Sequence, residues 1–476
     1  MQTLFYRLKS LFYLANCRHV LILILIAVLP AWAYAQEAAG VAQPDLKHHF
    51  VGYLTIAITA IAYIIAMTED VHEMKKSKPM ILGSALTWFA ICTYYTLHGQ
   101  AQIAAKAFET NLTAYVELML FIVVSMTYLN TLSERGIFNG LRIYLLNKQF
   151  SYRQLFWIIG GLSFFFSTFV SSLTVGLLMG AIVLTVGKNQ PKFIALTCVN
   201  IVVAANAGGT MSPLGGISTL FVWQKGILHF TEFFALTVPC LINFFVPAIF
   251  MHFSVPKETP HAPQETIQLK RGSKRIIFLF VVTLGITVAA NIWLEMQPVS
   301  GMIAGLGILQ FFTYYLIISE KPGGSEQQKG FDIYKCIAGV DWDTLLFFYG
   351  AMLIVGALDF IGYLGQIAHY LFIEIDVSLA NILIGLSSAF VDNGTLMFAV
   401  LSMHPEIPKG QWLLLTLTLG VGGSLLAIGS APALHLLGLV KKDYTFSFHL
   451  RWMPAILLGF FLSIGSLFLL NASSFQ

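Results

Sequence analysis

Charged residues are scarce in this sequence. Only 11% of the 476 residues are Asp, Glu, Lys or Arg, while 57% are apolar; soluble domains have about 25% charged residues. This scarcity excludes a soluble globular protein, and the hydrophobicity excludes a disordered chain. A formal net charge of +4 is too small to indicate a nucleic-acid partner. Because a membrane-spanning helix takes about 20 apolar residues, the chain has room for about ten or more spans.

Cysteine is also rare, and motifs of hydrolytic chemistry are missing. The five cysteines are scattered, so they form neither a metal-ligand spacing nor a disulfide framework, and we interpret them as small buried apolar residues. His72-Glu73 lacks the second His of H-E-x-x-H, and G-x-S-x-G does not occur. We therefore expect a protein that is not an enzyme and that has no cofactor and no structural metal.

The N-terminus has the layout of a secretory signal. Three cations precede a short apolar run over 20–29, and Ala33-Tyr34-Ala35 forms an A-x-A cleavage site before Gln36. Residues 1–35 are predicted to be a signal peptide; the alternative is an uncleaved first helix. Either way the chain after Gln36 starts outside the cytoplasm, which predicts a bacterial inner-membrane protein with a periplasmic mature N-terminus.

Hydropathy predicts an all-α polytopic membrane protein. Simple spans are expected at 50–67, 80–97, 113–131, 232–253, 276–293, 300–318, 342–361 and 452–471, and longer or broken apolar stretches at 155–187, 193–224, 378–403 and 411–440. If 155–187 and 378–403 are re-entrant hairpins, 20 of the 27 Lys and Arg are cytoplasmic, 4 are outside and 3 lie in the signal. This asymmetry agrees with the positive-inside rule. It predicts two transmembrane halves, 50–253 and 276–471, joined by a cytoplasmic linker over 254–275.

Two segments, 113–224 and 342–440, repeat the same pattern in opposite predicted orientations. Glu117 and Asp343 each precede a Phe by four residues and a Gly by nineteen. The run Phe169-Val170-Ser171-Ser172-Leu173-Thr174 aligns with Phe390-Val391-Asp392-Asn393-Gly394-Thr395, and the glycine-rich run 208–216 aligns with 422–430. Inverted repeats of this kind are typical of secondary transporters, whose site lies where discontinuous helices from both halves meet.

Glycine and proline predict that one helix in each repeat is broken at membrane depth. The runs 207–216 and 420–432 are each rich in Gly and contain Pro. Non-helical backbone survives in a membrane only where it is buried in protein or lines a cavity, and its carbonyl groups suit a hard cation such as Na⁺. The alternative is that the glycines only permit close helix packing. The predicted ligands from unwound backbone are Asn206, Gly208, Gly209, Ser212, Gly215, Gly422, Gly423, Ser424, Gly429 and Ser430.

The hairpin tips add side-chain oxygens to the predicted ion site. Asp392 stands out, because an ionisable side chain deep in a bilayer is costly unless it is partnered or functional. A desolvated carboxylate favours a proton, whereas a nearby cation competes with that proton, so one group can exchange the two. The alternative role of Asp392 is a helix cap. The predicted tip ligands are Asp392, Asn393, Thr395, Ser171, Ser172 and Thr174. Glu117 and Asp343 are secondary candidates, because each is predicted in the first turn of its helix, where a carboxylate also suits the helix dipole.

Several motifs together resemble the NhaD-type sodium/proton antiporters of the ion transporter superfamily. They are Asn206-Ala207-Gly208-Gly209, Ser212-Pro213, Val222-Trp223-Gln224-Lys225-Gly226, Val391-Asp392-Asn393, Gly410-Gln411-Trp412 and Gly420-Val421-Gly422-Gly423-Ser424. The resemblance runs from about Gln43 to the C-terminus. It implies a homodimeric inverted-repeat carrier that exports Na⁺ or Li⁺ in exchange for protons, by moving a transport unit past a fixed scaffold.

The sequence departs from the family pattern at several positions, so the resemblance implies a divergent member. Members usually carry Asp-Asn where this chain has Ser171-Ser172, and an Asp followed by a Thr two residues later where it has Gly216 and Ser218. The usual Ile-Pro after the second tip is Gly394-Thr395. We expect exchange to persist with altered ion selectivity or coupling. The alternatives are an organic-anion or oxyanion carrier, which would partly tolerate Asp392→Asn, and a non-transporting membrane sensor.

Overall fold

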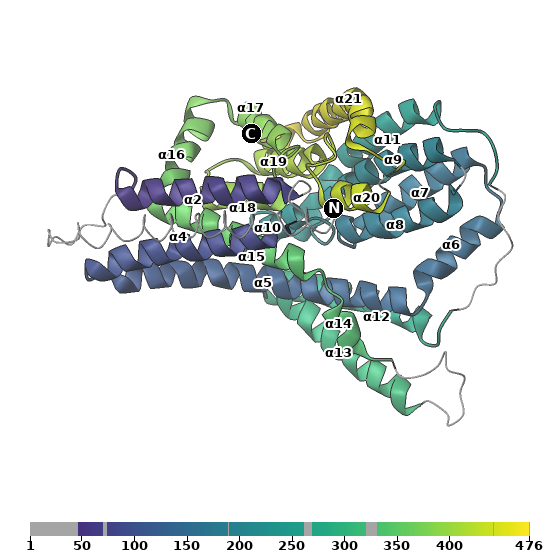
Figure 1. The fold of residues 1–476 in the computed structure, drawn as a ribbon, viewed down its shortest axis with the longest axis horizontal. Coiled ribbons are helices and arrows are strands. Elements are labelled where there is room, and N and C mark those ends of the chain that lie inside the picture. The colour runs from purple at the N-terminus through teal and green to yellow at the C-terminus, as the bar shows by residue number, and fades with distance from the viewer. Residues whose placement is uncertain are drawn as a thin grey trace, which may run out of the picture. The chain divides into compact units, whose positions relative to one another are not determined.

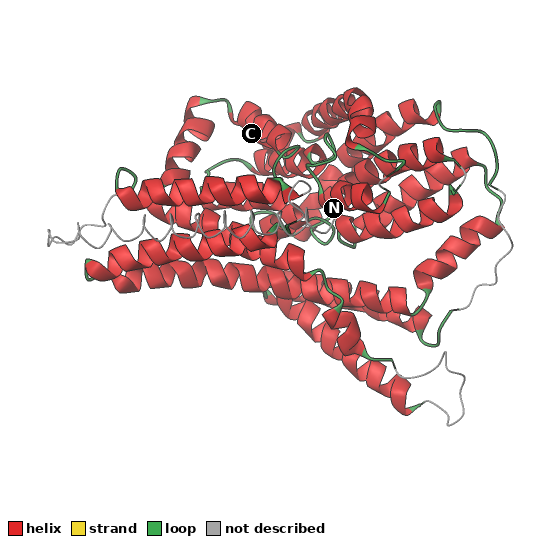
Figure 2. Ribbon diagram, in the orientation of Figure 1, coloured by secondary structure: helices red, strands yellow, loops and turns green. Residues whose placement is uncertain are grey.

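The computed structural model describes residues 46–69, 74–188, 190–260, 269–319, 331–440 and 442–475. Within these ranges the regular elements are all helices (Figure 2). Nine helices among the described residues are long and apolar enough to cross a membrane. The predicted class, an all-α polytopic membrane protein, is therefore confirmed. The signal predicted over 1–35 lies outside the described residues.

The first of two compact units contains the described residues up to Leu112 together with Tyr349–Tyr363. Its helices are α2 (Phe50–Met67), α4 (Ser77–Leu97), the start of α5 (Ala101–Glu134) and the second part of α15 (Trp342–Ile361). The indole Nε1 of Trp88 donates to the carbonyl of Leu353 at 2.8 Å. Both residues belong to a buried core contributed by α2, α4, α5 and α15. This hydrogen bond satisfies the polar atom of a large side chain inside an apolar core.

The second unit contains Thr113–Phe348 and Leu364–Gln476. Its α-helices are labelled in Figure 1. The first group is α6 (Ile137–Asn147), α7 (Tyr152–Ser167), α8 (Ser172–Val186), α9 (Pro191–Thr210), α10 (Ile217–Gln224), η2 (Phe230–Leu236) and α11 (Thr237–His252). The next is α12 (Ser273–Leu294), α13 (Pro298–Ile318) and α14 (Ile333–Ala338). The last is α16 (Tyr363–His369), η4 (Tyr370–Glu374), α17 (Val377–Ser387), α18 (Asn393–Ser402), α19 (Lys409–Gly422), α20 (Ala431–Leu439), α21 (Phe446–Leu470) and η5 (Ala472–Phe475).

Helices α9 and α19 form the core of the second unit. The apolar window of α9 is 100% buried, against 28% for α12, so α9 is surrounded by protein and not by lipid. Helix α7 packs along α9, α17 packs along α19, and α11 packs against both α9 and α21. Pro191 starts α9 at a position where its missing N–H costs nothing. The centre of the unit is thus built from the first arms of the two predicted broken helices.

Helices α5, α12 and α13 are joined by a tight polar contact. The hydroxyl of Tyr128 on α5 donates to the carbonyl of Gly305 and lies 2.7 Å from Thr283 Oγ1. Gly301 and Gly305 on α13 face Thr287 and Thr283 on α12 so closely that a Cβ at either glycine would overlap the threonine. Small residues allow helix backbones to approach in this way in membranes.

The structure corrects the predicted start of one span. Helix α5 begins at Ala101, whereas hydropathy placed this span at 113–131. The added turns contain Lys106, Glu109 and Asn111, whose polarity lowers hydropathy without ending a helix. Glu117 therefore lies well inside the helix, and the predicted first-turn position is wrong for it. Asp343 does lie in the first turn of α15, as predicted.

Candidate functional site

The two predicted hairpins are pairs of helices interrupted at their tips. Helix α7 ends at Ser167 and α8 begins at Ser172; α17 ends at Ser387 and α18 begins at Asn393. The start of the first hairpin and the start of α9, the helix that follows it, meet at Glu258. Its carbonyl accepts from the backbone N–H of Tyr152 at 2.9 Å, and its carboxylate accepts from the amide of Gln190 at 2.6 Å. Helix α8 therefore returns to the end where α7 began.

A serine just before each tip attaches its hairpin to a core helix. Ser167 Oγ donates to the carbonyl of Ala205 at 2.6 Å, and Ser388 Oγ donates to the carbonyl of Leu419 at 2.8 Å. All four residues are fully buried. Leu419 is among the last four residues of α19, whose carbonyl groups lack intrahelical partners, so Ser388 supplies its donor. Ala205 lies one turn further inside α9, where the serine adds a second donor to its carbonyl. The two contacts join equivalent positions of the two aligned segments.

Glycines bring the same helix pairs into backbone contact. A Cβ at Gly208 would overlap the carbonyl oxygen of Phe164, and a Cβ at Gly422 would overlap that of Gly385. These two contacts are also at aligned positions. Beyond the helix ends, the carbonyl oxygen of Gly429 lies 3.0 Å from where a Cβ of Gly423 would stand. The glycines therefore make room for neighbouring backbone, as Gly alone can.

The second arms of the hairpins pack across the two halves. Helix α8 lies on α20, with Gly176 against Pro432, and α18 lies on α10, with Gly394 against Ile217. Ile217 directly follows the first helix break, and Pro432 is the second residue after the second helix break. Phe221 and Phe398 extend the contact of α10 with α18, with ring centroids 5.6 Å apart. Each tip is thus placed beside the break of the opposite half.

The two tips differ in charge and in capping. Asp392 is the N-cap of α18, and its carboxylate accepts from the backbone N–H of Thr395 at 3.1 Å and from Thr395 Oγ1 at 3.5 Å. Ser171 holds the N-cap position of α8 without a side-chain cap hydrogen bond. The positive end of a helix dipole favours a carboxylate such as Asp392. Ser172 and Thr174 lie in the first turn of α8, and Asn393 is the first residue of α18.

The breaks are shorter than the sequence predicted. Non-helical backbone covers 211–216 between α9 and α10, and 423–430 between α19 and α20. Ser212, Gly215, Gly423, Ser424, Gly429 and Ser430 lie in these breaks, as predicted. The predicted unwinding is wrong for Asn206, Gly208, Gly209 and Gly422, which are helical. For Gly208 and Gly422 the alternative, close helix packing, is correct, because a neighbouring backbone occupies the space of a Cβ.

Sequence reasoning missed the two serines that attach the hairpins. Ser167 stands four residues before Ser171, and Ser388 stands four before Asp392. The available signal was this shared spacing, a serine at the same distance before each tip. It was missed because both serines lie outside the aligned runs. Ser430, in contrast, was predicted as a ligand, but through its backbone. Its hydroxyl oxygen is buried and has no hydrogen-bond partner among the described residues.

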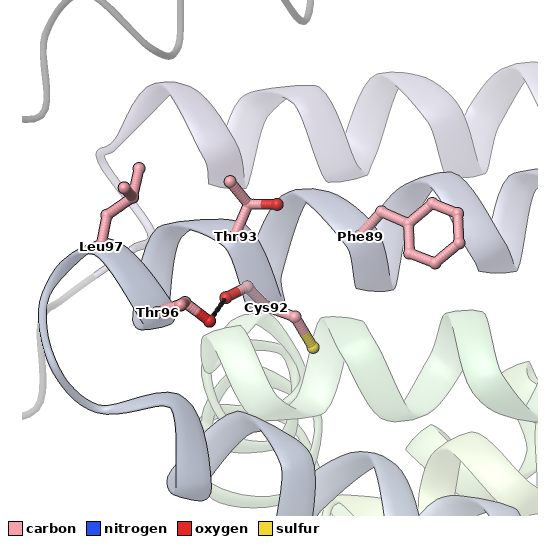
Figure 3. Close-up of a pocket in the computed structure, with 5 residues that line it drawn as sticks. All are labelled: Phe89, Cys92, Thr93, Thr96 and Leu97. Carbon is pink, nitrogen blue, oxygen red and sulfur yellow. Dashed lines mark hydrogen bonds between the residues drawn. The ribbon is translucent and has the colours of Figure 1, made fainter.

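A surface pocket on α4 differs from this site in its lining. It has a volume of about 310 Å³ and is lined by Phe89, Cys92, Thr93, Thr96 and Leu97 (Figure 3). The hydroxyl of Thr96 donates to the carbonyl of Cys92 at 2.7 Å, so its proton is already used within the helix. The lining contains no carboxylate, and the pocket offers little to a cation.

Comparison with known proteins decides the family. The NhaD Na⁺/H⁺ antiporter of Vibrio cholerae is 44% identical over 90% of this chain and 94% of its own length. The NhaD proteins of Alkalimonas amylolytica and Halomonas elongata are 45% and 43% identical, each over more than 90% of both chains. The chain belongs to the NhaD antiporter family. The resemblance inferred from the motifs is confirmed.

The wider relationship is also visible. Residues 50–420 match a family model described as a citrate transporter. This match includes both hairpins, the first broken helix and most of the first arm of the second. The second break, over 423–430, lies beyond it.

Proposed function

We propose that this protein is a multi-pass secondary transporter that exchanges Na⁺ for protons at the meeting point of the two tips and the two breaks. The observation that carries the proposal is the position of Asp392. It caps α18, two residues before Gly394, which packs on Ile217 at the end of the first break. A carboxylate beside unwound backbone can bind either a proton or a cation surrounded by oxygen ligands.

The donor set around Asp392 favours a hard monovalent cation. The predicted oxygens are the side chains of Asn393 and Thr395, Ser171, Ser172 and Thr174 from the other tip, and the backbone of the two breaks. Na⁺ binds carbonyl, hydroxyl and carboxylate oxygens of this kind, and one carboxylate balances one positive charge. Li⁺, which has the same charge and ligand preference, is proposed as a second substrate.

We also propose that 113–224 and 342–440 are inverted-topology repeats with re-entrant hairpins. Paired contacts at aligned positions support this reading, above all the two serine hydrogen bonds and the two glycine contacts described above. The glycines aligned at the ends of the first helices, Gly136 and Gly362, both have a positive φ, 79° and 97°. Glycine in this conformation commonly terminates a helix.

Localisation and assembly follow the family expectation. We propose a bacterial inner-membrane protein with a periplasmic mature N-terminus, a cytoplasmic linker over 254–275 and a homodimeric assembly. The distribution of Lys and Arg supports this orientation. The part of the linker that directly follows α11 lies across the starts of α7 and α9 through the contacts of Glu258.

The proposal is tested by exchange in everted vesicles that contain a pH-sensitive dye. Addition of Na⁺ or Li⁺ at neutral and alkaline pH is expected to cause dequenching, and K⁺ and Ca²⁺ serve as comparison ions. Asp392→Asn should abolish the response while keeping the helix cap, because Asn caps as well as Asp. Asp376→Asn is the matched control, since Asp376 also caps a helix and accepts from the N–H of Leu379 at 2.9 Å. An absence of any response in the unsubstituted protein would refute the antiporter.

A second candidate function is an organic-anion or oxyanion carrier. The match to the citrate transporter family model favours it, as does the absence of acidic residues at Ser171 and Ser172. This function predicts that Asp392→Asn is partly tolerated, whereas Ser171→Ala and Ser172→Ala stop transport. Uptake of labelled dicarboxylate in the same vesicles separates the two candidates.

A further inference from the structure

His449 lies at the start of α21 and has no solvent exposure in the structure. Its Nε2 lies 2.9 Å from the carbonyl oxygen of Ser424, and its Nδ1 lies 2.8 Å from the hydroxyl of Tyr444. Ser424 is fully buried and is in the second break, two residues after the end of α19. Tyr444, 1% exposed, follows α20. One imidazole ring therefore contacts both ends of the segment that contains the break and α20.

The partners of the ring determine its tautomer. A carbonyl oxygen can only accept a hydrogen bond, so we assign the proton to Nε2. In the neutral ring Nδ1 is then an acceptor, and the Tyr444 hydroxyl donates to it. Both ring nitrogens and the hydroxyl are thereby satisfied inside the protein. The two hydrogen bonds therefore run in one direction: Tyr444 donates to His449, and His449 donates to the carbonyl of Ser424.

The Ser424 carbonyl lacks a helical partner because the helix has ended two residues earlier. Neighbouring donors bond to carbonyl groups at the end of α19: the hydroxyl of Ser424 donates to the carbonyl of Val421 at 2.6 Å, and the N–H of Leu425 donates to the carbonyl of Gly422 at 3.0 Å. His449 supplies the donor from outside the segment. The peptide between Ser424 and Leu425 is therefore turned toward α21, which fixes how the rest of the break leaves α19.

The first break is held by different contacts. At the position aligned with Ser424, the hydroxyl of Thr210 donates to Asn206 at 2.7 Å, within its own helix. Thr219 Oγ1 on α10 donates to the carbonyl of Ser212 at 3.0 Å. The first break is thus held from within its own broken helix, whereas the second is held by a residue of α21.

We propose that His449 is a positioning residue for ion exchange. Its Nε2–H holds the Ser424 carbonyl, and its Nδ1 binds the Tyr444 hydroxyl, so the second break keeps the shape in which Gly423, Gly429 and Ser430 face the ion site. This inference rests on the proposed exchange of Na⁺ and protons. His449 itself does not touch the ion; it acts through the backbone of Ser424.

The test compares His449→Leu with His449→Gln in the full-length protein. Leu removes both hydrogen bonds, whereas Gln keeps an N–H donor for the Ser424 carbonyl. We expect Leu to raise the Na⁺ concentration for half-maximal dequenching at least about fivefold, since leaving a buried carbonyl unpaired has an effect of that size or more. Gln should restore most of the affinity. His435→Leu is the matched control, because His435 bonds only the carbonyl of Ala431 in its own helix among the described residues.

A second readout is independent of transport. Hydrogen exchange of the backbone amides over 423–430, measured by mass spectrometry, should speed up in His449→Leu and stay near normal in His449→Gln and His435→Leu. Unchanged half-saturation in His449→Leu, or a Gln variant as impaired as Leu, overturns the inference. If the unsubstituted protein does not exchange Na⁺ at all, the proposed function fails. The amide-exchange comparison then still decides whether His449 holds the break.

Discussion

Replacing Gly208 with Ala adds one methyl group where α9 meets the backbone of α7. The new Cβ would overlap the carbonyl oxygen of Phe164, and the carbonyl carbon and Cα of Phe164 lie 2.8 and 2.9 Å away. These are main-chain atoms of a buried helix, so they cannot rotate out of the way. The methyl group can be accommodated only if α7 and α9 move apart.

The magnitude follows from two opposing contributions. Overpacking of a close-packed interior costs about 1–3 kcal/mol. Ala is favoured over Gly inside a helix by about 0.8–1.0 kcal/mol. Gly208→Ala should therefore lower the free energy of unfolding by up to about 2 kcal/mol. Gly161→Ala on α7 is the matched control, because a Cβ there meets no heavy atom within 4 Å. It should raise the free energy of unfolding by up to about 1 kcal/mol.

Unfolding of the purified protein, titrated with a denaturing detergent and followed by far-UV circular dichroism, measures both variants. The two substitutions add the same atoms, so opposite signs would locate the effect in the contact between α7 and α9. Gly422→Ala should behave like Gly208→Ala, because its Cβ would overlap the carbonyl of Gly385. Equal stability of Gly208→Ala and Gly161→Ala would refute this account of the glycine.

Three further predictions concern hydrogen bonds and pH. Ser167→Ala and Ser388→Ala should each lower the free energy of unfolding by about 0.5–3 kcal/mol, because each removes a buried hydrogen bond between a hairpin and a core helix; a difference between the two much larger than this range would argue against equivalent roles. Tyr128→Phe should lower it by a similar 1–3 kcal/mol in the same detergent titration, and no loss would show that its two contacts are dispensable. Burial, followed by the charge of a neighbouring histidine, lowers the pKa of His49. The neutral form is therefore favoured in the folded state, and stability should fall as pH drops below the ordinary value of about 6.5. His49→Asn, which preserves the helix cap, should reduce this loss in melting curves recorded at neutral and mildly acidic pH.

Hydropathy was sufficient for the spans because the bilayer imposes a length and a composition on each of them. All eight simple spans correspond to helices in the structure. The boundary error at α5 arose because a helix can continue beyond the apolar segment. Residues 101–112 are helical but too polar for a hydropathy window, so the position of Glu117 could not be obtained from composition.

The breaks were predicted in the right places but with the wrong extent. A glycine has two uses in a membrane protein, to permit unusual backbone conformation and to permit close approach, and a sequence does not distinguish them. Pro213 does distinguish them, because the residue before a proline disfavours helix, and the first break indeed begins at 211. Gly208 and Gly422 proved to be packing residues because the neighbouring hairpin passes next to them, which only the three-dimensional structure reveals.

The crossed packing of α8 on α20 and of α18 on α10 has a mechanical consequence. Each hairpin is attached through its serine to the core helix of its own half and lies with its second arm on the broken helix of the other half. A displacement of either tip is therefore transmitted to both breaks. We therefore expect these eight helical arms to move together in transport, so that the carboxylate at one tip and the hydroxyls at the other change their exposure at the same moment.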